Sequence, residues 1–350
     1  MNEDPRATSI EQPSAGLASR GASSTGRLLI TKSTRGILGR VRNASTLVMV
    51  IVCWVGLSLS NPYFFTALNV SNIFSHSANI ALIAMGLTVV LVAGEIDLSV
   101  GSVEALGAAV SALLIVNGHL PVALAICATV GAGILAGSVS GLIRVLFRVP
   151  SFVTTLGMLS VASGIALVIT NGNPVYGLPS SFTVIGQGSF GPIPVDVIIA
   201  VAIGVALYLL MTRTRFGLHV HVLGDSEWAA RSVGLRISGL RVTVLALSGG
   251  LAALAGMIVA AEIASGNGSI GSSDLLSALA AVVIGGTSLF GGVGDIRGTA
   301  LGVILIASLE DGLELFNVAA FWEQVVIGCL ILGAVTIDYL LRPRGENSDR

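Results

Sequence analysis

Residues 94–102 read Gly-Glu-Ile-Asp-Leu-Ser-Val-Gly-Ser, and a long apolar stretch lies on each side of them. Two carboxylates, Glu95 and Asp97, therefore stand where membrane hydrocarbon is expected to begin or end. Ionisable groups at that depth are costly, and they usually face a protein interior or a watery cavity on a transport path. Gly94 and Gly101 let the backbone leave helical geometry, which a membrane tolerates only where protein or cavity water satisfies the amides.

Composition points to a protein that crosses a membrane several times. Of the 350 residues 53% are hydrophobic and only 11% are charged, whereas soluble proteins carry about 25% charged residues. The mean hydropathy is +0.91. Cys53, Cys127 and Cys329 fall inside apolar stretches without disulfide or metal-ligand spacing, so we expect buried thiols and no metal site.

Ten apolar segments approach the length of about 20 residues that crosses a bilayer. They are 45–62, 77–93, 102–118, 121–143, 151–170, 193–211, 242–263, 275–290, 299–317 and 320–341.

The basic residues set the orientation of these segments. All 18 Lys and Arg fall in the amino tail, in the loops 144–150, 212–241 and 291–298, or in the carboxyl tail. Since basic residues gather in cytoplasmic loops, we expect an all-α membrane protein with ten spans and both termini in the cytoplasm. Residues 1–44 are expected to be a disordered basic tail, 45–341 the transmembrane domain, and 342–350 a second cytosolic tail.

A short motif occurs twice. Residues 99–104 read SVGSVE and residues 269–274 read SIGSSD, so each copy combines Ser-aliphatic-Gly-Ser with an acid two residues later. The copies lie five spans apart, which reverses their orientation in the membrane. Inverted repeats with broken segments are typical of transporters and lie near the substrate path; chance similarity among small residues is the alternative. The residues predicted for a translocation path or gate are Glu95, Asp97, Ser99, Gly101, Ser102, Ser269 and Gly271.

The inner loop 212–241 contains a pattern that predicts a short helix. Asp225 or Ser226 is suited to cap it, Glu227 to occupy its first turn, and Gly234 to end it. Small side chains in between would allow this helix to seat in a groove of another protein; a solvated connector is the alternative. The predicted coupling residues are Glu227, Ala229, Ala230 and Gly234.

Two stretches carry a family resemblance. Residues 94–102 closely resemble the Gly-Ile-Asp-Leu-Ser-Val-Gly-Ser signature of the sugar-importer permeases (the ribose, xylose and autoinducer-2 group), with Glu95 where those permeases usually have Gly. Residues 281–302 resemble the second signature of that family. More loosely, loop 212–241 resembles the Glu-Ala-Ala…Gly coupling loop of ATP-binding-cassette (ABC) importers, with Trp228 interrupting the run. The resemblance spans residues 70–341.

This resemblance implies the inner-membrane permease subunit of an importer, with the ten-helix architecture of the vitamin-B12-type ABC permeases. It implies a second permease, which is another copy of this chain or a close relative, together with two ATPase subunits and a periplasmic sugar-binding protein. It also implies import of a monosaccharide or related polyol. ATP and magnesium would be held by the ATPase, so this chain would need no cofactor, would catalyse no reaction, and would contact lipid rather than nucleic acid.

The sequence itself supports a separate ATPase. Lys32 is the only lysine and Thr31 precedes it, so the chain has no Gly-Lys-Ser/Thr phosphate loop. Residues 291–298 (GGVGDIRG) lack dinucleotide-binding spacing, and they predict a tight inner turn with Asp295 and Arg297 solvated or mutually paired. The residues assigned to that turn are Gly291, Gly292, Gly294 and Arg297.

Several questions stay open at this level. Glu310, Asp311 and Glu314 can share one helical face, either toward the path or a partner, or at the outer surface if the ninth span ends early. A branched-chain amino-acid ABC permease is one functional alternative. A stand-alone carrier is another, with Glu95, Asp97 and Glu104 as proton or sodium sites.

Overall fold

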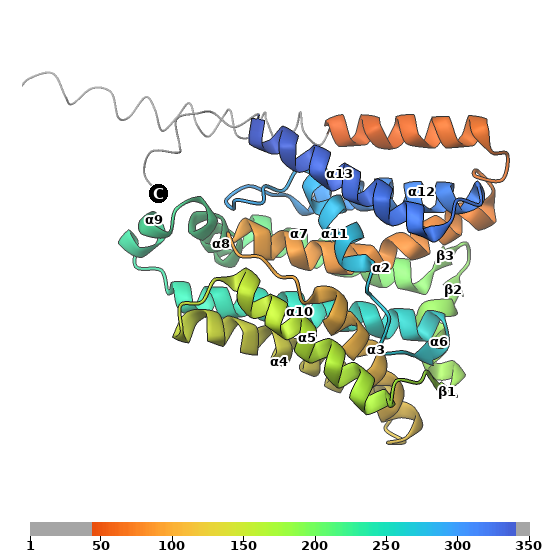
Figure 1. Cartoon of the computed structure of the whole chain (residues 1–350), viewed down its shortest axis with the longest axis horizontal. Helices are drawn as coiled ribbons and strands as arrows, with labels where there is room; N and C mark the ends of the chain where they lie inside the picture. The colour runs from red at the N-terminus through yellow and green to blue at the C-terminus, as the bar shows by residue number, and fades with distance from the viewer. Residues whose placement is uncertain (1–43, 341–350) are drawn as a thin grey trace, which may run out of the picture. The chain divides into compact units, whose positions relative to one another are not determined.

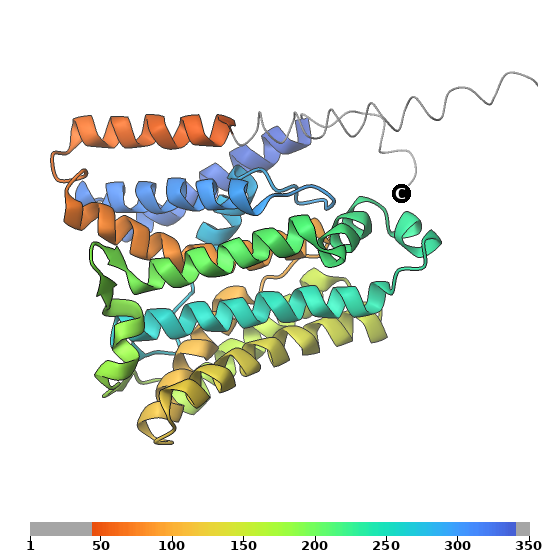
Figure 2. The ribbon, with the colours of Figure 1, turned by 180° about the vertical axis from the view of Figure 1, so that it is seen from behind.

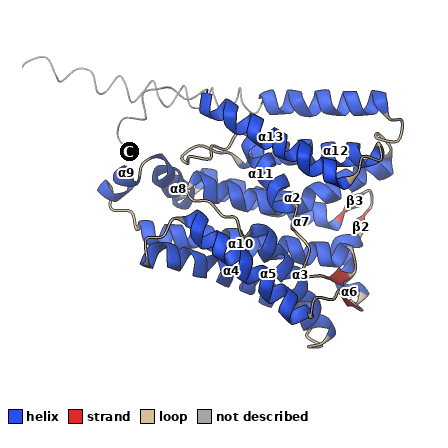
Figure 3. Ribbon diagram, viewed as in Figure 1, coloured by secondary structure: helices blue, strands red, loops and turns tan. Residues whose placement is uncertain are grey.

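The structure is a computed structural model that describes residues 44–340, and nearly all of them are helical (Figures 1 and 3). Both predicted tails, apart from Ala44, lie outside the described residues. In chain order the elements are a first helix Ala44–Ser60, α2 Ala67–Val92, α3 Val100–Val116, α4 Val122–Leu146, α5 Ser151–Thr170, β1 Val175–Tyr176, α6 Ser180–Gln187, β2 Ser189–Phe190, β3 Ile193–Pro194, α7 Val195–Arg213, α8 Arg215–Asp225, α9 Glu227–Ser232, α10 Ile237–Glu262, β4 Ser265–Gly266, α11 Asp274–Ile284, α12 Ile296–Leu315 and α13 Ala320–Leu340.

Five of these helices are long and apolar enough to cross a membrane, namely α2, α4, α5, α7 and α10. The apolar windows of α2 and α10 are 89% and 78% buried, whereas those of α4, α5 and α7 are at most 28% buried. Helices α2 and α10 are therefore central, and the other three present apolar faces outward, as lipid-facing helices do. The prediction of a polytopic all-α membrane protein is confirmed; the count of ten spans stays a prediction.

Helix α10 packs closely along α4, and the two run side by side in Figure 2. A Cβ atom at Gly133 would overlap the Gly249 carbonyl oxygen, and one at Gly137 would overlap the Leu245 carbonyl oxygen. Small residues let membrane helices approach to backbone contact, which replaces the hydrophobic driving force that lipid does not provide. This glycine seam holds α4 and α10 together.

Helix α11 differs most from its predicted segment, 275–290. It contains 11 residues, about 16 Å at 1.5 Å per residue, which is roughly half of the hydrocarbon thickness. It ends because Gly285 is followed by Gly286 at φ +86°, and the chain stays irregular as far as Asp295. The segment is therefore a half-length helix with irregular chain on both sides.

The two ends of the long helices differ in character. Helices α8 and α9 lie at one end, and the short strands β1, β2 and β3 with α6 lie at the other (Figure 1). Every arginine in the described part of the chain lies at or near the α8–α9 end; these are Arg144, Arg148, Arg213, Arg215, Arg231, Arg236, Arg241 and Arg297. Below, the α8–α9 end is called the basic end and the other the strand end.

The expectation of buried thiols is wrong for two of the three cysteines. Cys127 on α4 and Cys329 on α13 are exposed on the surface of the chain, and Cys53 is half-buried. Lipid tails are as apolar as leucine, so an apolar residue on a membrane helix faces either the protein or the lipid. Hydropathy therefore does not predict burial here.

Candidate functional site

Three separately predicted motifs meet at the basic end. Gly94 ends the turn after α2, Gly224 lies in the last turn of α8, and Gly291 lies in the turn before α12. A Cβ atom at Gly291 would clash with the Gly224 carbonyl and the Gly94 Cα, and a Cβ at Gly224 would overlap the Val92 carbonyl oxygen. We call the contact between Gly94, Gly224, Gly291 and Gly292 the glycine junction.

Local geometry and one backbone hydrogen bond fix the glycine junction. Gly94, Gly291 and Gly292 have φ values of +74°, +93° and +74°, a conformation that glycine adopts without steric cost. The Gly292 N–H donates to the Val92 carbonyl at 2.9 Å, which satisfies a carbonyl at the end of α2. The end of α2, the end of α8 and the turn before α12 are thus in direct backbone contact.

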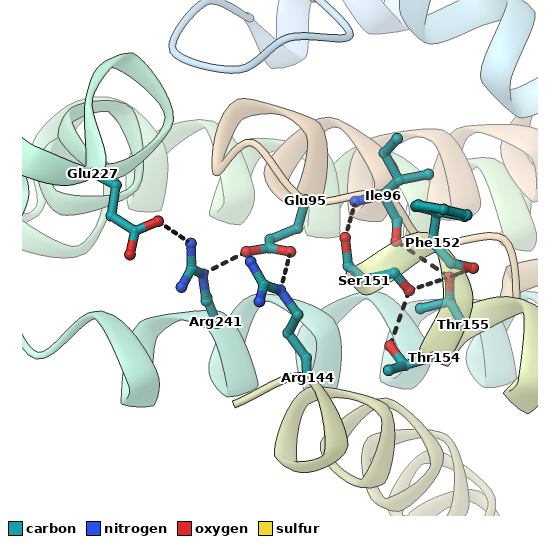
Figure 4. A network of polar contacts seen from close by, with 9 residues as sticks. All are labelled: Glu95, Ile96, Arg144, Ser151, Phe152, Thr154, Thr155, Glu227 and Arg241. Atoms are coloured by element: carbon teal, nitrogen blue, oxygen red, sulfur yellow. Dashed lines mark hydrogen bonds and ion pairs between the residues drawn. The ribbon is translucent and has the colours of Figure 1, made fainter. Parts of the chain in front are cut away.

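A network of charged side chains lies beside this junction (Figure 4). The Glu95 carboxylate accepts from Arg144 Nε on α4 at 3.0 Å, and its other oxygen lies 2.5 Å from Arg241 Nε on α10 as an ion pair rather than an aligned hydrogen bond. The Arg241 Nη2 donates to Glu227 on α9 at 2.7 Å, and Arg231 also pairs with Glu227. We call Glu95, Arg144, Arg241 and Glu227 the carboxylate–arginine chain.

Burial makes this chain energetically important. The Glu95 side chain is only 2% exposed, and those of Arg144 and Arg241 are 19% and 14% exposed. A buried carboxylate is tolerated only when it is paired, and removing one member of such a pair strands the other charge. Hydrogen bonds from Arg241 and then Arg231 lower the pKa of Glu227 to about 2, so its carboxylate is ionised at neutral pH.

The irregular segment between α2 and α3 is held by side chains of α5. Ser151 Oγ accepts from the Ile96 N–H at 3.0 Å, and Thr155 Oγ1 donates to the Ile96 carbonyl at 3.2 Å (Figure 4). Thr155 Oγ1 also accepts from the Leu98 N–H at 3.1 Å. These hydroxyls supply the partners that a helix would otherwise provide, which non-helical backbone at membrane depth requires. The segment is therefore fixed.

Asp97 anchors the bend that leads into α3. One carboxylate oxygen accepts from the Ser99 N–H at 2.9 Å and from Ser99 Oγ at 2.6 Å, and the other accepts from Ser248 Oγ on α10 at 2.8 Å. The hydroxyl of Ser102 donates to the Ser99 carbonyl at 2.8 Å. Asp97 therefore joins the start of α3 to α10.

The two copies of the repeated motif touch each other. A Cβ atom at Gly101 would overlap the Gly271 carbonyl oxygen, and one at Gly271 would overlap the Gly101 carbonyl oxygen. The Asn79 amide, half-way along α2, donates to Glu104 at 3.0 Å and to Asp274 at 3.2 Å. The equivalent acids of the two copies thus share one amide. Ser269 is exposed, and its N–H donates to the Asn267 side chain at 3.0 Å.

The loop 212–241 contains the predicted short helix and one helix that was not predicted. Ser226 Oγ accepts from the Ala229 N–H at 3.2 Å and caps α9, which ends before Gly234 at φ +75°. Ala230 is buried. The turn before α12 also has the predicted form, because Arg297 Nε donates to Asp295 at 3.1 Å; the Arg297 guanidinium also lies 4.9 Å from the Tyr208 ring centroid.

A cavity of about 760 Å³ lies at the strand end. Amide and hydroxyl side chains line it together with six acids, and His76 is the one side chain among the described lining residues that can carry positive charge. His76 Nε2 lies 2.9 Å from Glu310, and Asn69 donates to Asp311 at 2.8 Å. The acids are Glu262, Asp274, Glu310, Asp311, Glu314 and Glu323.

This cavity bears on the acids whose position the sequence left open. Helix α12 continues to Leu315, so Glu310, Asp311 and Glu314 lie on its last turns and line the cavity. The residues predicted for the translocation path are not among the described residues that line it. Most of them lie instead at the buried bend after α2 and at the contact between the two motif copies.

Sequence reasoning missed the partners of Glu95 and the helix α8. In the sequence, Arg144 and Arg241 indicate only inner loops, although they lie on the same expected side of the membrane as Glu95. Within α8, the buried residues Gly217, Val220, Leu223 and Gly224 follow the three- and four-residue spacing of a helix face. That spacing was the available signal.

Comparison with known proteins identifies the family. The family model described as branched-chain amino acid transport system / permease component matches residues 69–335. The chain belongs to this permease family. The permease is 40% identical over 284 residues to the ribose import permease protein of Bacillus subtilis (strain 168), covering 81% of this chain and 88% of that protein.

Further relatives of the permease carry related descriptions. The L-arabinose ABC transporter permease protein of Azospirillum brasilense is 32% identical, over 88% of this chain and 91% of that protein. The autoinducer 2 import system permease protein of Salmonella typhi is 31% identical, over 86% of each. The resemblance to the sugar-importer group is confirmed, and the permease is a transport subunit rather than an enzyme.

Proposed function

We propose that this permease is the membrane-spanning subunit of an ATP-driven importer that moves a monosaccharide or related polyol from the periplasm into the cytoplasm. The observation that carries the proposal is the 40% identity to a ribose import permease over 88% of that protein's length. The arrangement of the chain supports it, because the signature stretch 94–102, the turn before α12 and the α8–α9 loop meet at one place.

The remaining parts of the importer follow from the same proposal. Two ATPase subunits would bind ATP and magnesium, a periplasmic sugar-binding protein would deliver the substrate, and a second copy of this permease would complete the path. The chain would cross the inner membrane ten times in the vitamin-B12-type architecture with both termini in the cytoplasm. This chain would hold no cofactor or metal and would contact lipid.

Helix α9 is the proposed docking element for the ATPase. It is short and capped, and it lies at the basic end, which the proposed orientation places in the cytoplasm because arginines gather there. Glu227, Ala229, Ala230 and Gly234 would form or shape the docking surface. Movement of α9 would then reach the predicted path residues Glu95, Asp97, Ser99, Gly101, Ser102, Ser269 and Gly271.

Reconstituted transport tests the proposal directly. The permease is placed in liposomes with its cognate ATPase and binding protein, and uptake of labelled ribose, arabinose and xylose is measured with and without ATP. ATP-dependent uptake of one of these sugars, or of a polyol tested next, is expected. Uptake by the permease alone, driven by an ion gradient, would contradict it.

A branched-chain amino-acid importer is the second candidate, because the matching family model carries that description. The same liposomes, with labelled leucine, isoleucine or valine and the binding protein added outside, decide between the two. The relatives named above are described as sugar or autoinducer-2 permeases, so we expect no amino-acid uptake.

Thiol labelling tests the proposed orientation. In a chain whose three cysteines are replaced, Glu314→Cys at the strand end and Ser232→Cys on α9 are each exposed to a maleimide that cannot cross the membrane. Labelling of the first variant in intact spheroplasts, and of the second only in inverted vesicles, is expected. The reverse pattern would overturn the orientation.

A further inference from the structure

The permease function does not explain one feature of the described residues, namely the placement of Glu95. Its side chain is 2% exposed, and it contacts arginines from two different helices. A buried charged group is costly unless it is paired. A smaller uncharged residue would avoid that cost, so we look for the role of this carboxylate in the elements that its ion pairs connect.

The pairs connect the proposed docking helix to the proposed path. Glu227 on α9 is bound by Arg241 at the start of α10, and Arg241 pairs with Glu95. Two residues later, Asp97 binds both Ser99 at the start of α3 and Ser248 further along α10. The first turn of α3 then contains Gly101, which is in contact with Gly271 of the other motif copy.

We propose that Glu95 is a positioning residue that transmits movement of α9 to the start of α3 through Arg241. The inference rests on the proposed function. Arg241 contributes two nitrogens to two different carboxylates, so a displacement of Glu227 pulls on the same guanidinium that holds Glu95. Arg144 on α4 fixes the second oxygen of Glu95, which leaves the carboxylate little freedom to absorb that displacement.

The structure also shows why the link is stiff rather than merely adhesive. Ser151 accepts from the Ile96 N–H and Thr155 accepts from the Leu98 N–H, and both hydroxyls belong to α5. Side chains whose partners are all satisfied are locked in one arrangement. A shift at Glu95 therefore moves the segment 95–99 together with the start of α5, to which it is bound, instead of being dissipated in a flexible loop.

The test measures coupling rather than activity alone. The full complex is reconstituted with wild-type permease and with Glu95→Gln, Glu227→Gln and the double variant, and sugar uptake per ATP hydrolysed is determined. Each single variant is expected to lower this ratio by about tenfold, and the double variant is expected to be no worse than either single, because residues of one network are non-additive.

Two arginines near the start of α10, Arg236 and Arg241, supply the control. Arg241→Gln removes the shared guanidinium, while Arg236→Gln removes the same charge at the exposed N-cap of α10. Arg241→Gln is expected to lower uptake per ATP as Glu95→Gln does, and Arg236→Gln is expected to leave it within twofold. Glu227 is half-buried and Arg236 is exposed, so these two variants are expected to fold and the test stands even where Glu95→Gln does not assemble.

The outcomes separate this inference from the proposed function. Wild-type permease without ATP-driven uptake would refute the proposed function itself. Wild-type uptake together with an unchanged ratio in Glu95→Gln, or with effects of Glu95→Gln and Glu227→Gln that multiply in the double variant, would refute the relay alone. Equal losses in Arg236→Gln and Arg241→Gln would also refute it, since general charge at the basic end would then be the cause.

Discussion

The two ends of this permease handle charge in opposite ways. At the basic end, Glu95 and Glu227 are held by arginines in fixed pairs beside a backbone contact of four glycines. At the strand end, six acids line an open cavity in which His76 is the single described side chain able to carry positive charge. The first arrangement suits a rigid connection between helices, and the second suits a hydrated, polar vestibule.

The difference shows that burial, rather than the number of charges, decides what an acid contributes. Glu95 is buried and paired, so its loss leaves arginines without a counter-charge. Glu314 is exposed in the cavity, so water screens it and its loss changes little. Four predictions test this contrast, beginning with the largest effect.

The glycine junction should be the least tolerant position. Gly224→Val places a Cβ against two backbone atoms, the Val92 carbonyl oxygen and the Gly292 nitrogen. Overpacking typically costs about 1–3 kcal/mol and more where the neighbours cannot move aside; these backbone atoms cannot rotate away, so we expect a cost above that range and the largest of the four effects. We expect loss of folded protein, or a sharply lower melting temperature in detergent. Gly239→Ala on α10 is the control, because a Cβ there meets nothing within 4 Å; a normal melting temperature for Gly224→Val would contradict the junction.

Glu95 should matter more to stability than Glu314. Breaking a buried ion pair by removing one partner costs about 3–5 kcal/mol, whereas surface substitutions usually lie within about 0.5 kcal/mol of zero. We therefore expect Glu95→Ala to lower the melting temperature of the purified permease and Glu314→Ala to leave it unchanged. Equal shifts in the two variants would show that the two ends do not differ as described.

The pH dependence of α9 follows from Glu227. Its folded-state pKa of about 2 lies below its ordinary value of 4.5, so its contribution is fully present above pH 4.5 and is lost as the pH falls toward 2. Because the side chain is 42% exposed, the contribution is at most about 1 kcal/mol. The difference in melting temperature between wild type and Glu227→Gln should be constant from pH 7 to 5 and disappear by about pH 2; a difference that changes between pH 7 and 5 would exclude this origin.

The smallest effect is expected for His76. Its pair with Glu310 joins a side chain that is 51% exposed to one that is 12% exposed, and exposed pairs contribute about 0–1 kcal/mol. His76→Gln should shift the melting temperature by less than the Glu227→Gln variant does at pH 7, and the shift should shrink in high salt. A destabilisation as large as that of Glu95→Ala would mean that the His76–Glu310 pair is shielded from water like the pairs at the basic end.

Much of the architecture could be predicted because hydropathy reports directly on membrane segments. Each predicted segment overlaps a helix of the described chain, and Ser226 and Gly234 bound α9 as their capping chemistry indicates. Helix α11 was predicted too long, because apolar residues continue past Gly285 although the backbone does not stay helical. Burial was not predictable, as the exposed Cys127 and Cys329 demonstrate.

The sequence by itself determined the class of the protein, the arginine asymmetry, the repeated motif and the capped helix α9, because each depends on local composition or spacing. Only the tertiary structure decided that Arg144 and Arg241 neutralise Glu95, that Asn79 joins Glu104 to Asp274, and that Gly94, Gly224 and Gly291 are in contact. Asn79, for example, binds one residue 25 positions away in the chain and another 195 positions away. No local sequence pattern encodes such a pairing. The physical reason is that a buried charge requires an opposite charge nearby and a glycine without a side chain allows close backbone contact. Which residue supplies that charge or contact is decided only by how the helices pack.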